Sequence, residues 1–191
     1  MTLNQTPKSR RIKAVRANAY YSPITNRLLE YWHEKRGTAA RPKWRDINLS
    51  ELEDITQYLA IRDVIDGGEE TVCRHWGEGQ RRVLGFDATG KLLAESHDPD
   101  SALLLIRIFR MAMRYGQPIR VVGYADFAEG DKNMTFEGII LPVDGRREGE
   151  IKHFVNAYDY DYKLRSDDLT RDCVPNCWPT LEASRNAASK S

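Results

Sequence analysis

Two cysteines near the C-terminus, Cys173 and Cys177, have the spacing in this chain that most resembles a metal or redox motif. A tetrahedral zinc site needs four ligands, and no nearby His or Cys supplies the other two. We therefore interpret the pair as exposed thiols, with a redox couple or an intermolecular disulfide as alternatives. With Cys73 the chain has 3 cysteines, an odd count that indicates reduced thiols rather than a disulfide framework.

Acidic residues gather at two places that could serve an enzyme, Asp159 with Asp161 and Asp167 with Asp168. An active site needs a nucleophile with its base, or paired acids in a cleft. These acids fall at a strand end and in a polar tail, where solvated charge is the ordinary role. The sequence therefore predicts a non-catalytic protein.

The 191 residues are 41% hydrophobic, which suits one domain of ordinary size. The net charge of +1 argues against a dedicated nucleic-acid or membrane-surface binder. Every charged residue before Glu30 is basic, so residues 1–21 are interpreted as a disordered basic arm, with contact to an acidic partner or to nucleic acid as the alternative. No stretch has the length of a membrane span and no secretory signal is apparent, so we expect a cytoplasmic protein.

The pattern of apolar residues predicts an α+β fold. Helices are predicted over residues 24–36, from Ser50, over 78–84 and over 99–115. Strands are predicted over residues 59–66, 70–76, 118–127, 133–142 and 150–159. Together they indicate a five-stranded antiparallel sheet with helices on one face and an N-terminal flanking helix. The domain would span residues 22–160, and the polar tail over 161–191 would be disordered.

A series of short motifs adds to this element order. They are Trp32, Arg36-Gly37, Pro42, Arg45-Asp46-Ile47, Asp63-Val64, Arg74-x-x-Gly77, Gly85, Gly90, Glu137, Leu141-Pro142-Val143 and Asp144-Gly145. In this order the chain resembles a family of small, mostly single-domain bacterial PAS proteins, over roughly residues 24–158. The resemblance implies a sensory or interaction module, in which some members hold haem, flavin or a small metabolite and many have no known ligand.

Two cofactors of such domains are disfavoured by the residues present. A haem-binding domain commonly takes its axial His from the long helix, and residues 99–115 contain no His. His97 falls just before that helix, where we expect a loop residue. A light-sensing flavin domain carries a reactive Cys in the helix after the second strand, and residues 78–84 contain none. Cys73 lies on the preceding strand and is interpreted as a small core residue.

Two functions remain open: a sensor that encloses a small apolar or amphipathic ligand, and a ligand-free adaptor or regulator of a partner such as a sensor kinase. An enzyme is kept as a remote third alternative. The long helix carries an apolar face opposite its arginines, and sites of this kind are mainly apolar. The residues expected to line a ligand site there are Leu105, Phe109, Met113 and Phe136. Equally, these bulky side chains could fill the interior and leave no room for a ligand.

Two further groups of residues have expected roles. Arg74 and Glu137 should make structural polar contacts, with each other or with Asp46 or Asp63, because a charge on a sheet needs a partner or solvent. The apolar stripe of the first helix should contribute to a homodimer interface. That stripe consists of Ile24, Leu28, Tyr31 and Trp32.

Overall fold

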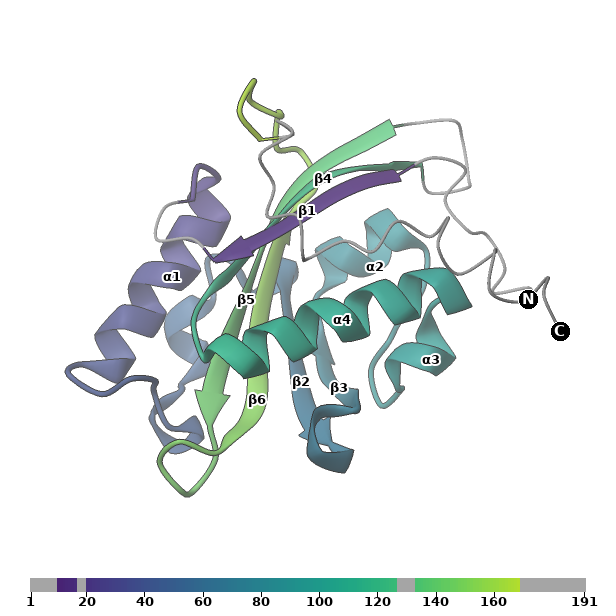
Figure 1. Cartoon of the computed structure of the whole chain (residues 1–191). Coiled ribbons are helices and arrows are strands. Elements are labelled where there is room, and N and C mark those ends of the chain that lie inside the picture. The colour runs from purple at the N-terminus through teal and green to yellow at the C-terminus, as the bar shows by residue number, and fades with distance from the viewer. Residues whose placement is uncertain (1–9, 17–19, 127–132, 169–191) are drawn as a thin grey trace, which may run out of the picture.

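The computed structural model describes residues 10–16, 20–126 and 133–168, which Figure 1 shows. Within these ranges six strands form one antiparallel sheet in the order β1-β4-β5-β6-β2-β3. Their bounds are Arg10–Arg16 for β1, Leu59–Ile65 for β2, Glu70–Trp76 for β3, Ile119–Asp126 for β4, Asn133–Asp144 for β5 and Ile151–Asp159 for β6. The α+β fold and the five predicted strands are confirmed, and β1 is added to them.

The helices are α1 at Pro23–Arg36, α2 at Glu78–Leu84, α3 at Leu93–Ser96 and α4 at Pro99–Tyr115. The prediction missed α3, whose four residues are too few to show a helical period. The helix predicted from Ser50 is a 3-10 turn over Leu49–Leu52. Its cap is Asn48, whose side chain accepts a hydrogen bond from the Ser50 amide at 3.2 Å.

Strand β1 lies inside the arm that was predicted to be disordered. It pairs with β4 from Arg10 opposite Ala125 to Arg16 opposite Ile119. Ala14 is buried and Ile12 is partly buried in the cluster under α4, and the basic residue Lys13 lies between them. The prediction is wrong for residues 10–16, because it weighed the charges and overlooked this alternation.

The prediction of a disordered tail is wrong for its first residues, 161–168. Tyr162 and Asp168 are 7% and 2% exposed, so residues 161–168 belong to the folded domain. The cysteine pair Cys173 and Cys177 lies outside the described residues.

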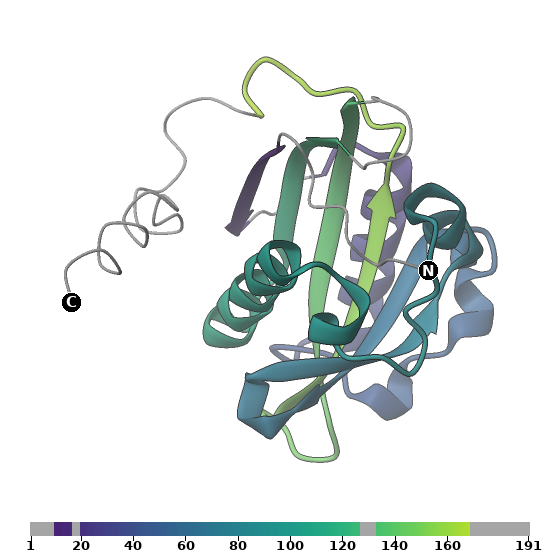
Figure 2. The same ribbon diagram turned by 90° about the vertical axis from the view of Figure 1, so that its right-hand side faces the viewer.

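Helices cover both faces of the sheet. Figure 2 shows α4 in front of the strands and α1 behind them. Along β5, Ile139 and Leu141 pack in one apolar cluster with α1, whereas Ile140 packs in the other with α4. This alternation follows from the two-residue repeat of a strand.

The apolar stripe of α1 packs on the face of the sheet opposite α4. Leu28, Tyr31 and Trp32 are at most 2% exposed, and the Trp32 Nε1 donates to the carbonyl of Pro142 at 2.9 Å. Ile24 packs, partly buried, on the same cluster. The predicted dimer interface on this stripe is therefore wrong, because the stripe covers the sheet of its own chain.

Candidate ligand-binding site

Two polar side chains lie on the interior face of the sheet beneath α4, one on β2 and one on β6. Opposite residues of an antiparallel pair share a face, and Arg62 lies opposite Phe154 while Ala60 lies opposite Asn156. Phe154 packs on Phe109 of α4 with their ring centroids 4.9 Å apart. Arg62 and Asn156 are therefore both on the α4 face.

Arg62 is a buried cation with little polar contact. It is 2% exposed, and its Nη1 lies 3.4 Å from the Oγ1 of Thr71. Within the described residues no carboxylate forms an ion pair with it. Its guanidinium carbon lies 5.8 Å from the ring centroid of Trp76 and 5.9 Å from that of Phe109. Burial lowers the pKa of Arg62, which is the expected effect of removing a charge from water.

Asn156 is buried beside Arg62 and has unused hydrogen-bonding capacity. It is 1% exposed, and among the described residues neither its Oδ1 nor its Nδ2 has a partner. Its opposite residues on the flanking strands are Ala60 and Ile140, whose side chains cannot form hydrogen bonds. A buried amide left in this state costs about 1–3 kcal/mol.

Aromatic rings close one side of this region. Trp76 and Phe86 stack with centroids 5.6 Å apart, and the His97 ring meets Phe86 edge-on at 5.2 Å. The Trp76 Nε1 donates to the Phe86 carbonyl at 3.0 Å, which fixes the indole. Burial, together with the positive charge of Arg62, lowers the pKa of His97 to about 4. His97 is therefore neutral at pH 7 and packs on two aromatic rings.

We expect His97 to titrate near pH 4 in an NMR pH titration of its ring signals. Its ordinary pKa is 6.5, so between pH 6.5 and about 4 the unfolded chain binds more protons than the folded chain. The free energy of unfolding should accordingly fall as the pH drops through this window. Arg62→Met should raise the pKa of His97 by removing the neighbouring charge. Titration of His97 near pH 6.5 in the folded protein would contradict this.

The four residues predicted to line a ligand site belong to the apolar cluster under α4. Phe109 and Phe136 are 3% and 6% exposed, whereas Leu105 and Met113 are partly buried. Three of them have different neighbours. Phe109 lies against Arg62, and Phe136 lies near Tyr160 with the ring centroids 6.2 Å apart. Met113 lies close to the turn between β2 and β3.

All four predicted polar residues make ion pairs, each away from Arg62 and Asn156. Arg74 Nε lies 2.5 Å from Asp63 Oδ2, and the other oxygen of Asp63 lies 2.8 Å from His153 Nδ1. Asp46 lies 3.6 Å from Nε of its exposed neighbour Arg45. Glu137, the fourth, does not pair with Arg74 or with either of these aspartates.

Exposure limits what the Arg74 pair contributes. The Arg74 side chain is 61% exposed, and exposed ion pairs typically contribute less than about 1 kcal/mol. Arg74→Ala is therefore expected to lower the free energy of unfolding by at most about 1 kcal/mol. Urea unfolding at pH 7 measures it. A loss of several kcal/mol would contradict the surface role.

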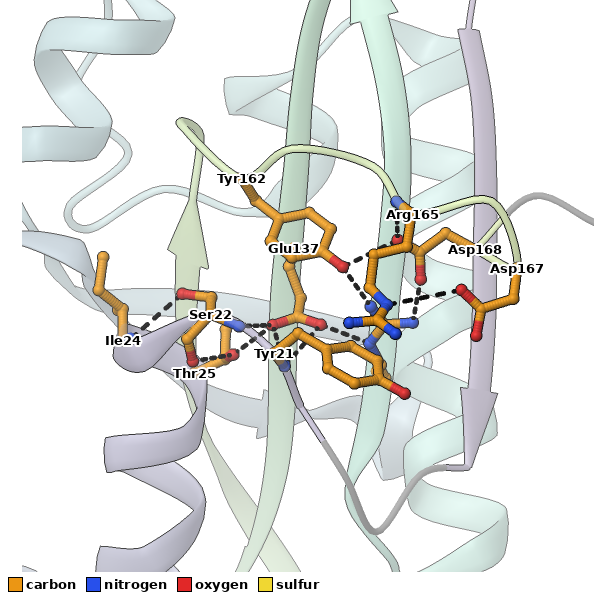
Figure 3. A network of polar contacts seen from close by, with 10 residues as sticks. Tyr21, Ser22, Ile24, Thr25, Glu137, Tyr162, Arg165, Asp167 and Asp168 are labelled. Carbon is orange, nitrogen blue, oxygen red and sulfur yellow. Dashed lines mark hydrogen bonds and ion pairs between the residues drawn. The ribbon is translucent and has the colours of Figure 1, made fainter.

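Glu137 is the centre of a separate, fully paired network on the α1 side, which Figure 3 shows. Its carboxylate is completely buried and accepts hydrogen bonds from the Ser22 amide and the Thr25 hydroxyl, both at 2.7 Å. The Tyr21 amide donates at 3.0 Å, and Arg120 Nε donates at 2.5 Å. Glu137 therefore joins β5 to the start of α1 and to β4.

Arg120 extends this network to the C-terminal segment. Its Nη1 lies 2.8 Å from Asp168, and its Nη2 donates to the Tyr162 hydroxyl at 3.2 Å. For Asp168, burial acts to raise the pKa, but hydrogen bonds from the Arg165 amide, Arg120 and Tyr162 outweigh burial and lower it. Because each carboxylate of this network contacts Arg120 and accepts further hydrogen bonds, we interpret the network as structural.

Arg62 and Asn156 were missed by the sequence analysis. Arg62 follows the apolar run of residues 59–61, and Asn156 lies between apolar residues in the run 154–157. A polar residue in such a run is the signal that could have found them, because a buried polar group needs a partner.

Two kinds of site do not occur within the described residues. In residues 10–16, 20–126 and 133–168, no group of three or more His, Cys, Asp or Glu side chains is placed to hold a metal ion. Over the same ranges, no helix combines the length and the apolar character needed to cross a bilayer.

A family model described as "PAS domain" matches residues 21–155, which is well over half of the chain. The chain belongs to the PAS domain family. This makes it a sensory or signalling module in general terms. The family motif Arg74-x-x-Gly77 has a steric reason here, because a Cβ on Gly77 would collide with the carbonyl oxygen of Gln57. Gly77 thereby lets the chain pass from β3 into α2.

A solved structure entitled "Structure of an RNA-binding Light-Oxygen-Voltage Receptor" is similar to this PAS protein, at 16% sequence identity and a TM-score of 0.43. The match covers 82% of this chain and 40% of that receptor, so the chain spans less than half of its length. A search of curated proteins found no significant match.

Proposed function

We propose that this PAS protein senses a small molecule bound between α4 and the sheet, and relays its presence to another signalling protein in the cytoplasm without catalysis. The observation that carries this proposal is the Asn156 amide, buried and without a partner in the described part of the chain. A ligand that forms hydrogen bonds with this amide recovers the free energy that its burial costs. The sensory role of PAS domains supports the same conclusion.

A ligand-free adaptor is the second candidate. What favours it is the bulk of Phe109 and Phe136, which are almost completely buried in the interior. An adaptor would act through its surfaces alone, by homodimer formation away from the buried α1 stripe or by contact with a partner such as a sensor kinase.

The experiment is native mass spectrometry of the full-length chain purified from cells, followed by a thermal-shift screen against a metabolite library. For the sensor we expect a co-purified small molecule, or compounds that raise the melting temperature. Asn156→Leu is the matched variant, because it keeps the volume and removes the hydrogen-bonding groups. It should fold and bind such a compound at least fivefold more weakly, the loss expected for one to two kcal/mol of hydrogen bonding. Wild-type protein with neither added mass nor thermal shift would favour the adaptor.

A further inference from the structure

The two buried arginines of the described chain have opposite surroundings. Arg120 is 6% exposed and lies within 2.5 Å of Glu137 and 2.8 Å of Asp168. Arg62 is 2% exposed and has the hydroxyl of Thr71 at 3.4 Å. Buried charges in proteins are ordinarily paired, as that of Arg120 is. The negative partner of Arg62 is therefore missing from the described part of its own chain.

We propose that this partner is the ligand, a small organic monoanion whose carboxylate binds Arg62. The proposal rests on the proposed function and adds to it the charge and the polar group of the ligand. A guanidinium has five N–H donors in a planar fork that matches a carboxylate, and Thr71 receives one of them.

Glu70 is the carboxylate that comes nearest to pairing with Arg62, but it already accepts other hydrogen bonds. Glu70 exerts a weak electrostatic effect on Arg62 but forms no ion pair with it. Its carboxylate accepts hydrogen bonds from the amides of Thr71 at 2.7 Å and Leu93 at 3.2 Å. Glu70 therefore holds the start of α3 and leaves the Arg62 donors available.

The charge count indicates a single negative charge on the ligand. Arg62 is the one buried cation on the α4 face within the described residues, since Arg120 belongs to the Glu137 network. His97, the nearest further base, is neutral at pH 7. A dianion such as a phosphate monoester would leave one charge unmatched in the interior, whereas a carboxylate would not.

The surroundings of Arg62 describe the rest of the ligand. Asn156 is two residues from the position opposite Arg62, a diagonal separation of about 7–8 Å that one small molecule can bridge. The ring centroids of Trp76 and Phe109 lie 5.8 and 5.9 Å from the guanidinium carbon of Arg62, and the two rings offer an apolar surface. We therefore expect a carboxylate with an apolar body and a hydrogen-bonding group that reaches Asn156.

The test compares acids with their own amides, which have the same shape without the charge. The probes are benzoate, phenylacetate and the straight-chain carboxylates from acetate to octanoate, each beside its amide. Binding to the full-length protein is measured at pH 7 by calorimetry and ligand-observed NMR. We expect at least one acid to bind tenfold or more tightly than its amide. Arg62→Met should abolish this preference, and Arg107→Met should leave it intact because Arg107 is exposed on α4.

The outcomes separate this inference from the proposed function. If the amides bind as tightly as the acids, the interior is a ligand site for neutral molecules, and the anion inference fails alone. If neither acids nor amides bind and the native mass shows no ligand, both fail. Arg62→Lys, which keeps the charge but not the fork, should retain part of the preference for acids. If Arg62→Met does not fold, Arg62→Lys and the comparison of acids with amides on the wild-type protein still test whether the ligand is an anion.

Discussion

Glu137→Ala is expected to lower the free energy of unfolding by about 3–5 kcal/mol, the loss typical of removing one partner from a buried ion pair. The substitution leaves Arg120 with Asp168 as its one described carboxylate partner and takes the acceptor from the Tyr21 and Ser22 amides at the start of α1. Urea unfolding at pH 7, followed by circular dichroism, measures the change.

Two variants control for this result. Glu137→Gln keeps an acceptor for the α1 amides and removes the charge, so it should lose less than Glu137→Ala. Glu51→Ala removes an acid that pairs with Lys35 at 2.6 Å on the surface, where the expected loss is below about 1 kcal/mol. If Glu137→Ala lost no more than Glu51→Ala, the network would not be what fixes α1 and residues 161–168.

Arg62→Met should change stability in the opposite direction and raise the free energy of unfolding of the ligand-free protein by about 1–4 kcal/mol, the range found when well-packed apolar side chains replace a buried ion pair. Methionine is flexible enough to fill the space of the arginine stem between Trp76 and Phe109. The measurement is urea unfolding of protein from which bound small molecules have been removed by unfolding and refolding.

Arg120→Met is the matched control for this prediction. It removes the same charge from an equally buried position, but it leaves Glu137 and Asp168 buried without their cation. It should therefore destabilise the protein, while Arg62→Met stabilises it. If both variants destabilised the protein equally, Arg62 would have a partner within its own chain and the anion site would be excluded.

If Arg62→Met raises the free energy of unfolding and Arg120→Met lowers it, Arg120 serves stability and Arg62 serves binding. A side chain that lowers stability in the free protein and whose removal abolishes binding is the usual signature of a functional site.

Much of the fold could be predicted because local signals mark its elements. Ser22 with Pro23 begins α1, and Asp98 caps α4, which ends at Gly116 with a φ of 60°. Strand β1 was missed because its basic residues favour solvent when they are considered alone. Its pairing with β4 depends on residues more than 100 positions away, which no local pattern reveals.

The candidate site could be predicted only in part. The helix period correctly indicated that Phe109 faces the interior. It could not show Arg62 and Asn156, because residues 59–62 of β2 and 154–157 of β6 are buried on both faces and the alternation that assigns a side chain to one face is lost. Their shared face follows from the register between β2 and β6, which is a property of the folded sheet.

Strand β1 also bears on strand pairing between molecules of this protein. It occupies the edge of the sheet beside β4, and a bare β4 edge would present a row of unpaired backbone groups along residues 119–125. Such an edge is a template for intermolecular strand pairing, and lysine or arginine on the outermost strand is a common defence against it. Lys13 and Arg16 lie on β1. The basic segment that was predicted to be disordered therefore covers the β4 edge, and we expect its removal to favour edge-to-edge aggregation.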